Sequence, residues 1–462
     1  MGTLMEVKVA LWPLALVLLL PSITNGLTLE LGSKQSVCDA TVEIINGIMD
    51  YSEGSRYGGT VGMFQQPYYW WEAGLVFGGL IDNWFICEND SNVKTIQDSI
   101  YHQAGPSYNY MILNQSKVEA NDDQLFWGLT TLEAAERGFP TVENEPTYLE
   151  LSQAVYNTMY ERWDDECRGG LRWQIFSNMS GWDYKSTVAN AGLFAMGARL
   201  GKFTSNKIYF ETSARVLRWI KEVTFIRSTD NYYIIYDGSN IADNQCSVIN
   251  GAIWSYNYAL FIMGSAYLYA ATNEDNWKNE VGMFLNGIEH FLTKNDDNIL
   301  YEYQCEVWGK CNNDQRAFRA IVARALGEVV QLVPDHAEKA QNILNASAKG
   351  AAFSCSGGSD GVTCGRDWSS NSWDGLYGLG EQIAALEIIQ NTLMSEKENP
   401  AGGGGDGTGD NGGNSDNLMK GSFITNLGKE FIPQIRTNTH TSTITHTSTY
   451  IKHVTTTTSI YA

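Results

Sequence analysis

The stretch from Ser186 to Phe203 reads STVANAGLFAMGARLGKF, and the stretch from Trp254 to Thr272 reads WSYNYALFIMGSAYLYAAT. Both are rich in Gly, Ala and aromatic residues and carry few charges, so as helices they would be buried on all sides. The stretch between them, from Asn206 to Ile226 (NKIYFETSARVLRWIKEVTFI), is amphipathic and carries the charges of a solvated face. This alternation predicts an inner layer of buried helices covered by an outer layer.

The same alternation continues along most of the chain. Apolar period, caps and breakers predict twelve helices, with a long loop before every even-numbered one; they span 35–51, 72–86, 92–103, 122–139, 146–164, 186–203, 206–226, 254–272, 275–292, 314–333, 335–355 and 378–394. The later even-numbered helices begin at 122, 186, 254, 314 and 378, and this spacing of 60 to 68 residues indicates a repeated helix hairpin. Six hairpins that close on themselves predict an all-α (α/α)6 toroid whose long loops share one rim.

Strand-like patches from Tyr232 to Tyr236 and from Ile299 to Tyr303 predict small β-hairpins in two of these rim loops. The toroid is expected to span residues 27–396 as one domain. Residues 1–26 have the features of a signal peptide, because Lys8 precedes a short apolar run from Val9 to Leu20. Residues 397–462 change to a Gly/Asp/Asn-rich linker and a Thr-rich tail, which cannot bury apolar surface.

Charge and cysteine content agree with an extracellular protein. Lys and Arg number 31 against 52 Asp and Glu, so the net charge of −21 argues against nucleic acid or anionic lipid as a partner. The 8 cysteines predict disulfides, and spacing favours the pairs Cys305 with Cys311 and Cys355 with Cys364. Sequons predict glycosylation at four positions, which are Asn89, Asn114, Asn178 and Asn345.

Asn121-Asp122-Asp123-Gln124 places two adjacent carboxylates at the start of an otherwise apolar inner helix. The structural alternative is a helix start, because Asn and Asp are preferred N-caps and their charge suits the helix dipole. The catalytic alternative is a pair of acids around one sugar anomeric carbon, at the roughly 5 to 5.5 Å separation of a retaining glycosidase. Two such close anions cannot both ionise freely, so the pair would provide one proton donor and one nucleophile.

Aromatic and polar residues in the rim loops or near the starts of inner helices predict the substrate site. Flat pyranose faces pack on aromatic rings, and polar side chains bind sugar hydroxyls. For each of these residues a core position or a local cap remains the alternative. The residues predicted to bind substrate are Trp71, Glu72, Asn121, Trp127, Trp173, Lys185, Asn190, Tyr256, Asn257, Arg366 and Trp368.

Six segments resemble glycoside hydrolase family 76, the α-1,6-mannanases, and especially its fungal cell-wall branch of the defective-in-filamentous-growth and defective-cell-wall type. The resemblance runs from about Val37 to Ile389. The segments are YYWWEAGLVFGGLIDNW at 68–84, NDDQLFWGLTTLEAAE at 121–136, CRGGLRWQ at 167–174, YKSTVANAGLF at 184–194, GAIWSYNYALFIMGSAYLY at 251–269 and WDGLYGLGEQIAALE at 373–387.

The resemblance implies an (α/α)6 toroid and retention at an α-1,6-mannosidic bond, with Asp122 as nucleophile and Asp123 as acid/base. It also implies a donor, either α-1,6-mannan or the mannose core of glycolipid-anchored glycoproteins, and wall β-glucan as acceptor. Plain endo-hydrolysis of mannan remains one alternative, and a noncatalytic mannan-binding wall protein remains another.

The expected location is secreted, in the cell wall or on the outer face of the plasma membrane. The fungal branch usually ends in a glycolipid-anchor signal with a closing hydrophobic tail, but Asn438 to Ala462 is Thr-rich. A protein free in the wall space and an incorrect last exon are the two alternatives for this difference. No cofactor or metal is expected; a calcium ion in the loop from Asn295 to Asn298 remains an open alternative.

Overall fold

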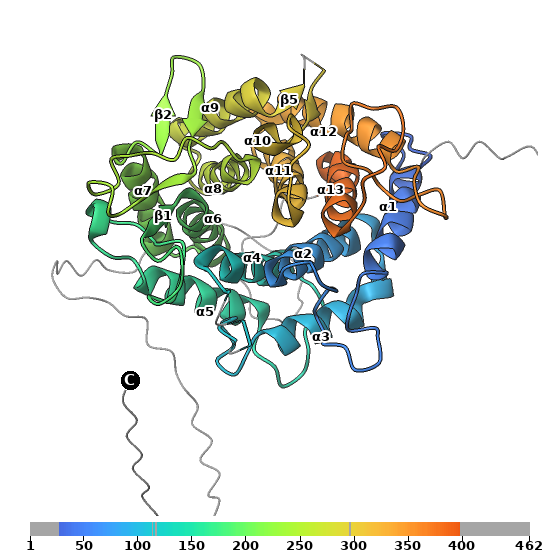
Figure 1. Cartoon of the computed structure of the whole chain (residues 1–462), viewed down its shortest axis with the longest axis horizontal. Helices are drawn as coiled ribbons and strands as arrows, with labels where there is room; N and C mark the ends of the chain where they lie inside the picture. The colour runs from blue at the N-terminus through green and yellow to red at the C-terminus, as the bar shows by residue number, and fades with distance from the viewer. Residues whose placement is uncertain (1–26, 113, 116–117, 295–296, 398–462) are drawn as a thin grey trace, which may run out of the picture. The chain divides into compact units, whose positions relative to one another are not determined.

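Paired helices form a ring in the computed structural model, which describes residues 27–112, 114–115, 118–294 and 297–397 (Figure 1). The inner helices are α2 (Trp70–Cys87), α4 (Asn121–Arg137), α6 (Thr187–Thr204), α8 (Ser255–Thr272), α11 (Asn313–Leu332) and α13 (Leu379–Gln390). The outer helices are α1 (Lys34–Met49), α3 (Val93–Gln103), α5 (Tyr148–Glu161), α7 (Lys207–Glu222), α9 (Asp275–Phe291) and α12 (Pro334–Ser354).

Packing between these helices follows the chain and then closes. Each inner helix contacts the next inner helix in the order α2, α4, α6, α8, α11 and α13, and α13 contacts α2 again. Each outer helix covers the inner helix before it, except that α1 covers α13. Burial explains the two layers, since α6 is buried almost throughout whereas α7 buries one face only. The predicted (α/α)6 toroid is therefore confirmed.

Short antiparallel strand pairs decorate the loops, joining β1 (Tyr184–Ser186) to β4 (Gly238–Asn240), β2 (Ile226–Ser228) to β3 (Tyr233–Ile235) and β5 (Thr293–Lys294) to β6 (Ile299–Leu300). The patch from Tyr232 to Tyr236 is a strand, as predicted. The patch from Ile299 to Tyr303 was predicted only in part, because a short helix, α10 (Tyr303–Glu306), begins there. The sequence did not predict the pairing of β1 with β4.

Four disulfides join all eight cysteines. Both predicted local bridges, Cys305–Cys311 and Cys355–Cys364, are confirmed. The other two bridges, Cys38–Cys87 and Cys167–Cys246, span 49 and 79 residues of sequence. Spacing alone does not identify such pairs.

Three predictions fall on residues outside the described ranges: the signal peptide at 1–26, nearly all of the linker and tail at 397–462, and the first half of the loop from Asn295 to Asn298.

Short 3₁₀ helices complete the ring region, at Asp90–Asn92, Glu166–Arg168 and Asn391–Glu396. Within the described ranges, the structure contains no helix with the length and apolar character needed to cross a bilayer.

Candidate active site

A cavity of about 680 Å³ opens at the end of the ring where every inner helix begins. Its wall contains carboxylates, aromatic rings and small residues, and it contains no lysine, arginine or histidine among the described residues. The wall residues are Tyr69, Trp71, Val118, Asp122, Asp123, Phe126, Trp173, Ser180, Gly181, Tyr184, Ser186, Val188, Asp237, Asn240, Trp254, Tyr256, Asp314, Gln315 and Phe318. The cavity is therefore rich in acidic side chains and suited to flat sugar rings.

Asp122 and Asp123 both reach this cavity from the first turn of α4. Asp123 Oδ2 accepts the backbone N–H of Ala120 at 2.6 Å, so Asp123 also caps the helix. Asp122 Oδ2 accepts the Nε1–H of Trp173 at 3.1 Å, and its Oδ1 has no hydrogen-bond partner among the described residues. The helix-start interpretation and the catalytic interpretation thus apply to the same residues.

The two carboxyl groups of this pair differ in their affinity for a proton. Burial raises the pKa of Asp122 to about 7, and the hydrogen bond from Trp173 limits that rise. Burial also raises the pKa of Asp123 well above its usual range, and the neighbouring charge of Asp122 raises it further. Asp123 therefore keeps its proton when Asp122 has lost one, which is the order that a general acid beside a nucleophile requires.

Two further carboxylates in the wall, Asp314 and Asp237, were not predicted. Asp314 Oδ1 accepts the Nε1–H of Trp71 at 2.9 Å, and Asp237 Oδ2 accepts hydrogen bonds from the Tyr184 hydroxyl and from Asn250 Nδ2. Burial raises the pKa of both acids. Asp314 lies in the first turn of an inner helix, as Asp122 does, so its position in the sequence could have indicated a cavity residue. Asp237 lies in a loop, where no sequence pattern indicated a cavity residue.

Three predicted aromatic residues, Trp71, Trp173 and Tyr256, are in the cavity wall. The Tyr256 ring stacks on Phe318, with ring centroids 4.1 Å apart and an interplanar angle of 6°. Trp173 is 38% exposed, which leaves part of its ring open at the cavity. Gly181 has a φ of +91°, and a Cβ there would lie 2.3 Å from the Trp173 ring, so glycine is required beside this indole.

Asn121, Lys185 and Asn190 were predicted to bind substrate, and the structure does not place them in the cavity wall. Asn121 Nδ2 donates to the Arg172 carbonyl at 2.9 Å, and Lys185 Nζ donates to the Gly170 carbonyl at 2.6 Å. Asn190 Nδ2 donates to the Leu171 carbonyl at 3.0 Å. All three side chains bind the loop that leads into Trp173, so they support the site without lining it.

Glu72, Trp127 and Asn257, which were also predicted to bind substrate, lie outside the cavity wall as well. Glu72 Oε2 accepts the Tyr69 N–H at 2.6 Å and so caps α2. Trp127 is fully buried, and its Nε1 donates to the Trp70 carbonyl at 3.3 Å. Asn257 is fully buried inside α8, and its side chain has no hydrogen-bond partner among the described residues.

Arg366 and Trp368 are the last of the residues predicted to bind substrate, and neither is in the cavity wall. Arg366 Nε lies 3.7 Å from Glu381 Oε1, so its charge is paired in the protein interior. The Trp368 ring is buried beneath the guanidinium of Arg319, which lies 3.8 Å from the ring centroid. A rim position in the sequence therefore does not distinguish a sugar ligand from a structural contact.

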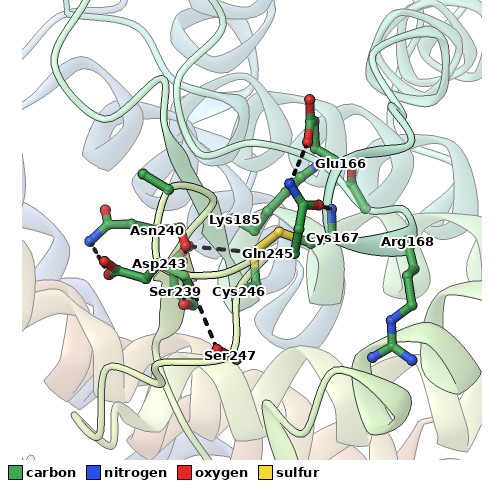
Figure 2. The surroundings of a disulfide bond; sticks show 12 residues. Glu166, Cys167, Arg168, Lys185, Ser239, Asn240, Asp243, Gln245, Cys246 and Ser247 are labelled. Atoms are coloured by element: carbon green, nitrogen blue, oxygen red, sulfur yellow. Dashed lines mark hydrogen bonds between the residues drawn. A yellow bond between two sulfur atoms is a disulfide. The ribbon is translucent and has the colours of Figure 1, made fainter.

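The Cys167–Cys246 disulfide joins two loops that both supply cavity residues (Figure 2). One loop continues to Trp173, and the other follows Asn240. Gln245 strengthens the junction, because its Oε1 accepts the Cys167 N–H at 2.8 Å. Cys167 and Cys246 have φ values of 56° and 63°, a region that costs non-glycine residues about 1 kcal/mol or more. The surrounding contacts hold both loops in this conformation.

The four predicted glycosylation positions differ in exposure. Asn114 and Asn178 are exposed. Asn89 Nδ2 donates to Asn83 Oδ1 at 3.1 Å, and Asn345 lies within α12, where its Oδ1 accepts a hydrogen bond from Gln341. Glycosylation stays a prediction at all four positions.

Among the described residues, no cluster of His, Cys, Asp and Glu has the arrangement of a metal site.

A ring of helix hairpins with acids and aromatic rings in a cavity at one end is the arrangement found in carbohydrate-active enzymes of the (α/α)6 type. The family model of glycosyl hydrolase family 76 matches residues 36–403, and the chain belongs to this family. It is a glycoside hydrolase, as the resemblance implied.

Comparison with curated relatives and with solved structures supports this family assignment. Mannan endo-1,6-alpha-mannosidase DFG5 of Saccharomyces cerevisiae is 46% identical over 380 residues, which cover 82% of each chain. Mannan endo-1,6-alpha-mannosidase DCW1 of the same yeast is 48% identical, over 84% of this chain and 86% of that protein. The crystal structure of Dfg5 from Chaetomium thermophilum in complex with glucosamine has a TM-score of 0.77 and 32% identity, over 81% of this chain and 94% of that one.

An inactive variant of an α-1,6-mannanase from a Salegentibacter species, in complex with α-1,6-mannotetrose, has a TM-score of 0.63. The match covers 78% of this chain and 99% of that one. At 14% identity this likeness supports the fold alone.

Proposed function

We propose that the protein is a retaining α-1,6-mannoside-active enzyme of the fungal cell wall. In the first step Asp122 attacks the anomeric carbon, and Asp123 gives its proton to the leaving glycosidic oxygen as the C–O bond breaks. The observation that carries the proposal is that both acids reach one cavity and that Asp123 holds its proton more tightly. Asp122 Oδ1, which lacks a hydrogen-bond partner in the described structure, is the atom that would form the new bond.

The second step releases the sugar from Asp122. Asp123, now ionised, takes the proton of an incoming hydroxyl while the hydroxyl oxygen attacks the anomeric carbon and the ester bond to Asp122 breaks. A glucan hydroxyl as acceptor gives transglycosylation, and water gives hydrolysis. We favour transfer to wall β-glucan, with plain mannan endo-hydrolysis as the alternative.

Two lines of support indicate the donor. The curated relatives are named as mannan endo-1,6-alpha-mannosidases, which favours an α-1,6-linked mannose chain. The described cavity wall has four carboxylates and no cationic side chain, and the Chaetomium structure holds glucosamine. An amino sugar is a cation at neutral pH and suits an anionic cavity. The mannose core of a glycolipid-anchored glycoprotein is therefore the proposed donor.

The proposed location is outside the cell, in the wall space or on the outer face of the plasma membrane. Four disulfides support an oxidising compartment. The net charge of −21 fits a neutral or cationic glycan better than an anionic polymer.

The test uses an α-1,6-manno-oligosaccharide donor with and without a β-gluco-oligosaccharide acceptor. Mass spectrometry separates coupled product from hydrolysed product, and proton NMR of the first product gives its anomeric configuration. Transfer with α configuration is the expected result. Release of reducing ends alone would leave the hydrolytic alternative, and an initial β product would exclude the two-step mechanism.

A noncatalytic mannan-binding protein is the alternative from another class. An unchanged donor after prolonged incubation with the wild-type protein, together with binding of the donor, would favour it.

A further inference from the structure

Trp308 is an exposed tryptophan in the segment that precedes α11, and it is not itself a residue of the cavity wall. It is 71% exposed, and its neighbours Tyr303 and Val307 are 41% and 60% exposed. These three side chains belong to the short segment of α10 and the turn after it. Large apolar groups in one exposed segment indicate a binding surface more often than isolated ones do.

The segment that carries Trp308 is rigid. The Cys305–Cys311 disulfide closes it, and the N–H groups of Trp308 and Lys310 both donate to the Cys305 carbonyl, at 3.2 and 3.1 Å. A ring on a fixed loop loses little conformational entropy when a ligand binds. The loop therefore constrains the backbone from which the Trp308 side chain extends.

The same segment is connected to two residues of the cavity wall, Trp254 and Asp314. Ser255 N–H donates to Glu302 Oε1 at 3.1 Å, and Ile253 N–H donates to Gln304 Oε1 at 3.2 Å, so the segment is attached on both sides of Trp254 in the cavity wall. After the segment, α11 begins, and Asp314 in its first turn is again a wall residue. Figure 1 shows α10 next to α11, between α11 and the outer helices α9 and α12, and Arg319 Nε of α11 lies 3.4 Å from Glu306 Oε1 of α10.

We propose that Trp308, with Tyr303, binds the β-glucan acceptor chain where it leaves the cavity. This inference rests on the proposed function and names the part of the protein that holds its acceptor. In a β-linked glucopyranose all ring hydroxyls are equatorial, so both faces present C–H groups that pack on an aromatic ring. An α-linked mannose has an axial hydroxyl at C2 and a less even face. The aromatic rings of Trp308 and Tyr303 are therefore expected to bind β-glucan more tightly than mannan.

The experiment measures binding without turnover. Trp308→Ala, Trp308→Tyr and the control Tyr160→Ala are each made in a protein that also carries Asp122→Asn. Tyr160 is 41% exposed and lies on α5, across the ring from α10 (Figure 1). Calorimetric titration uses a β-1,3-gluco-oligosaccharide and, separately, an α-1,6-manno-oligosaccharide of equal length.

Trp308→Ala is expected to weaken glucan binding about three- to tenfold, as loss of one aromatic contact does. Trp308→Tyr is expected to retain most of the binding, and Tyr160→Ala all of it. Absence of glucan binding by the parent, equal affinity in all variants, or weakening of mannan binding instead would each overturn this assignment. Transfer activity of the wild-type enzyme is measured in parallel, so failure of the acceptor site and failure of the proposed function give different results.

Discussion

Buried acids lie at two levels of the inner helix ring, in the cavity wall and deeper along the helices, and the two levels differ in the cations that contact the acids. At the cavity end, Asp122, Asp123, Asp237 and Asp314 share a wall in which no described residue is lysine, arginine or histidine. About eleven residues further along the inner helices, which is roughly 16 Å of helix, a second group of buried charges fills the middle of the ring. We call this second group the floor cluster.

All six inner helices contribute to the floor cluster. Its members are Asp82 on α2, Glu133, Glu136 and Arg137 on α4, Arg199 on α6, Tyr267 on α8, Arg324 and Glu328 on α11, and Glu387 on α13. Arg199 lies at its centre, since Nη2 is 2.5 Å from both Glu133 Oε2 and Glu136 Oε2. Burial raises the pKa of Glu133, but Arg199 and Arg137 lower it more, so that its pKa falls below the usual range.

The acids of the floor cluster and the acids of the cavity differ in their contact partners. In the floor cluster each acid contacts a guanidinium or a neighbouring polar group, so the charges hold helices together. In the cavity the acids meet only neutral hydrogen-bond donors such as Trp71 and Trp173, and their pKa values rise. An acid whose charge the protein leaves uncompensated is available to a substrate, and such acids mark catalytic sites.

The largest expected effect is the loss of turnover at the cavity end. Asp122→Asn removes the nucleophile and is expected to lower kcat at least about a thousandfold, with an unchanged melting temperature. Asp123→Asn is expected to lose as much with a mannoside but much less with an aryl mannoside, because a good leaving group needs no proton. Asp98→Asn, on the exposed face of α3, is the control. Equal loss for both donors with Asp123→Asn would contradict its role as acid.

The positions of the Asp pair and of the helix layers were predictable because their signals are local. A buried helix is apolar on all faces, so an acid pair in its first turn, as at Asp122 and Asp123, contrasts with the apolar residues of the later turns. The direction in which a side chain points depends on contacts with segments that are distant in the sequence. Lys185 and Asn190 also lie near the start of an inner helix, but they bond to backbone carbonyls of another loop.

Asp237 is a cavity residue that the sequence did not indicate, because its position also depends on contacts between distant parts of the chain. It directly precedes β4, which pairs with β1 through contacts such as Lys185 with Ser239, about fifty residues apart in sequence. That pairing and the Cys167–Cys246 bridge bring its loop to the cavity. Neither short strand has a pattern that fixes its partner, so no local signal indicated the fourth acid.

The next largest effect concerns the floor cluster. Arg199→Met leaves the acids that surround it without their cation and is expected to lower the free energy of unfolding by about 3 to 5 kcal/mol. Urea titration measures this loss. Lys94→Met breaks the exposed pair with Asp98 and is expected to cost less than about 1 kcal/mol. If both variants lose the same stability, the floor cluster does not hold the helices together.

Per pH unit, a smaller effect is expected for the dependence of stability on pH. Burial raises the pKa of Glu328 to about 8, so the folded protein keeps a proton that the unfolded chain releases above its usual value of 4.5. Stability is therefore expected to be complete below about pH 4.5 and to fall as pH rises toward 8, by up to about 1.4 kcal/mol per pH unit for this group. Glu328→Gln should reduce the slope in urea titrations at pH 5 to 8, and an unchanged slope would exclude Glu328 as its source.

The smallest effect tests how the cavity tunes its own nucleophile. Trp173 Nε1 donates to Asp122 and favours its ionised form, so Trp173→Phe is expected to raise the pKa of Asp122 and to shift the acidic limb of the kcat/KM profile upward by roughly one pH unit. Asp314→Asn removes a negative charge that raises the same pKa, so it is expected to shift that limb downward. Opposite shifts would show that neutral donors and uncompensated acids set the charge of the cavity. Shifts in the same direction would mean that both substitutions act through cavity shape instead.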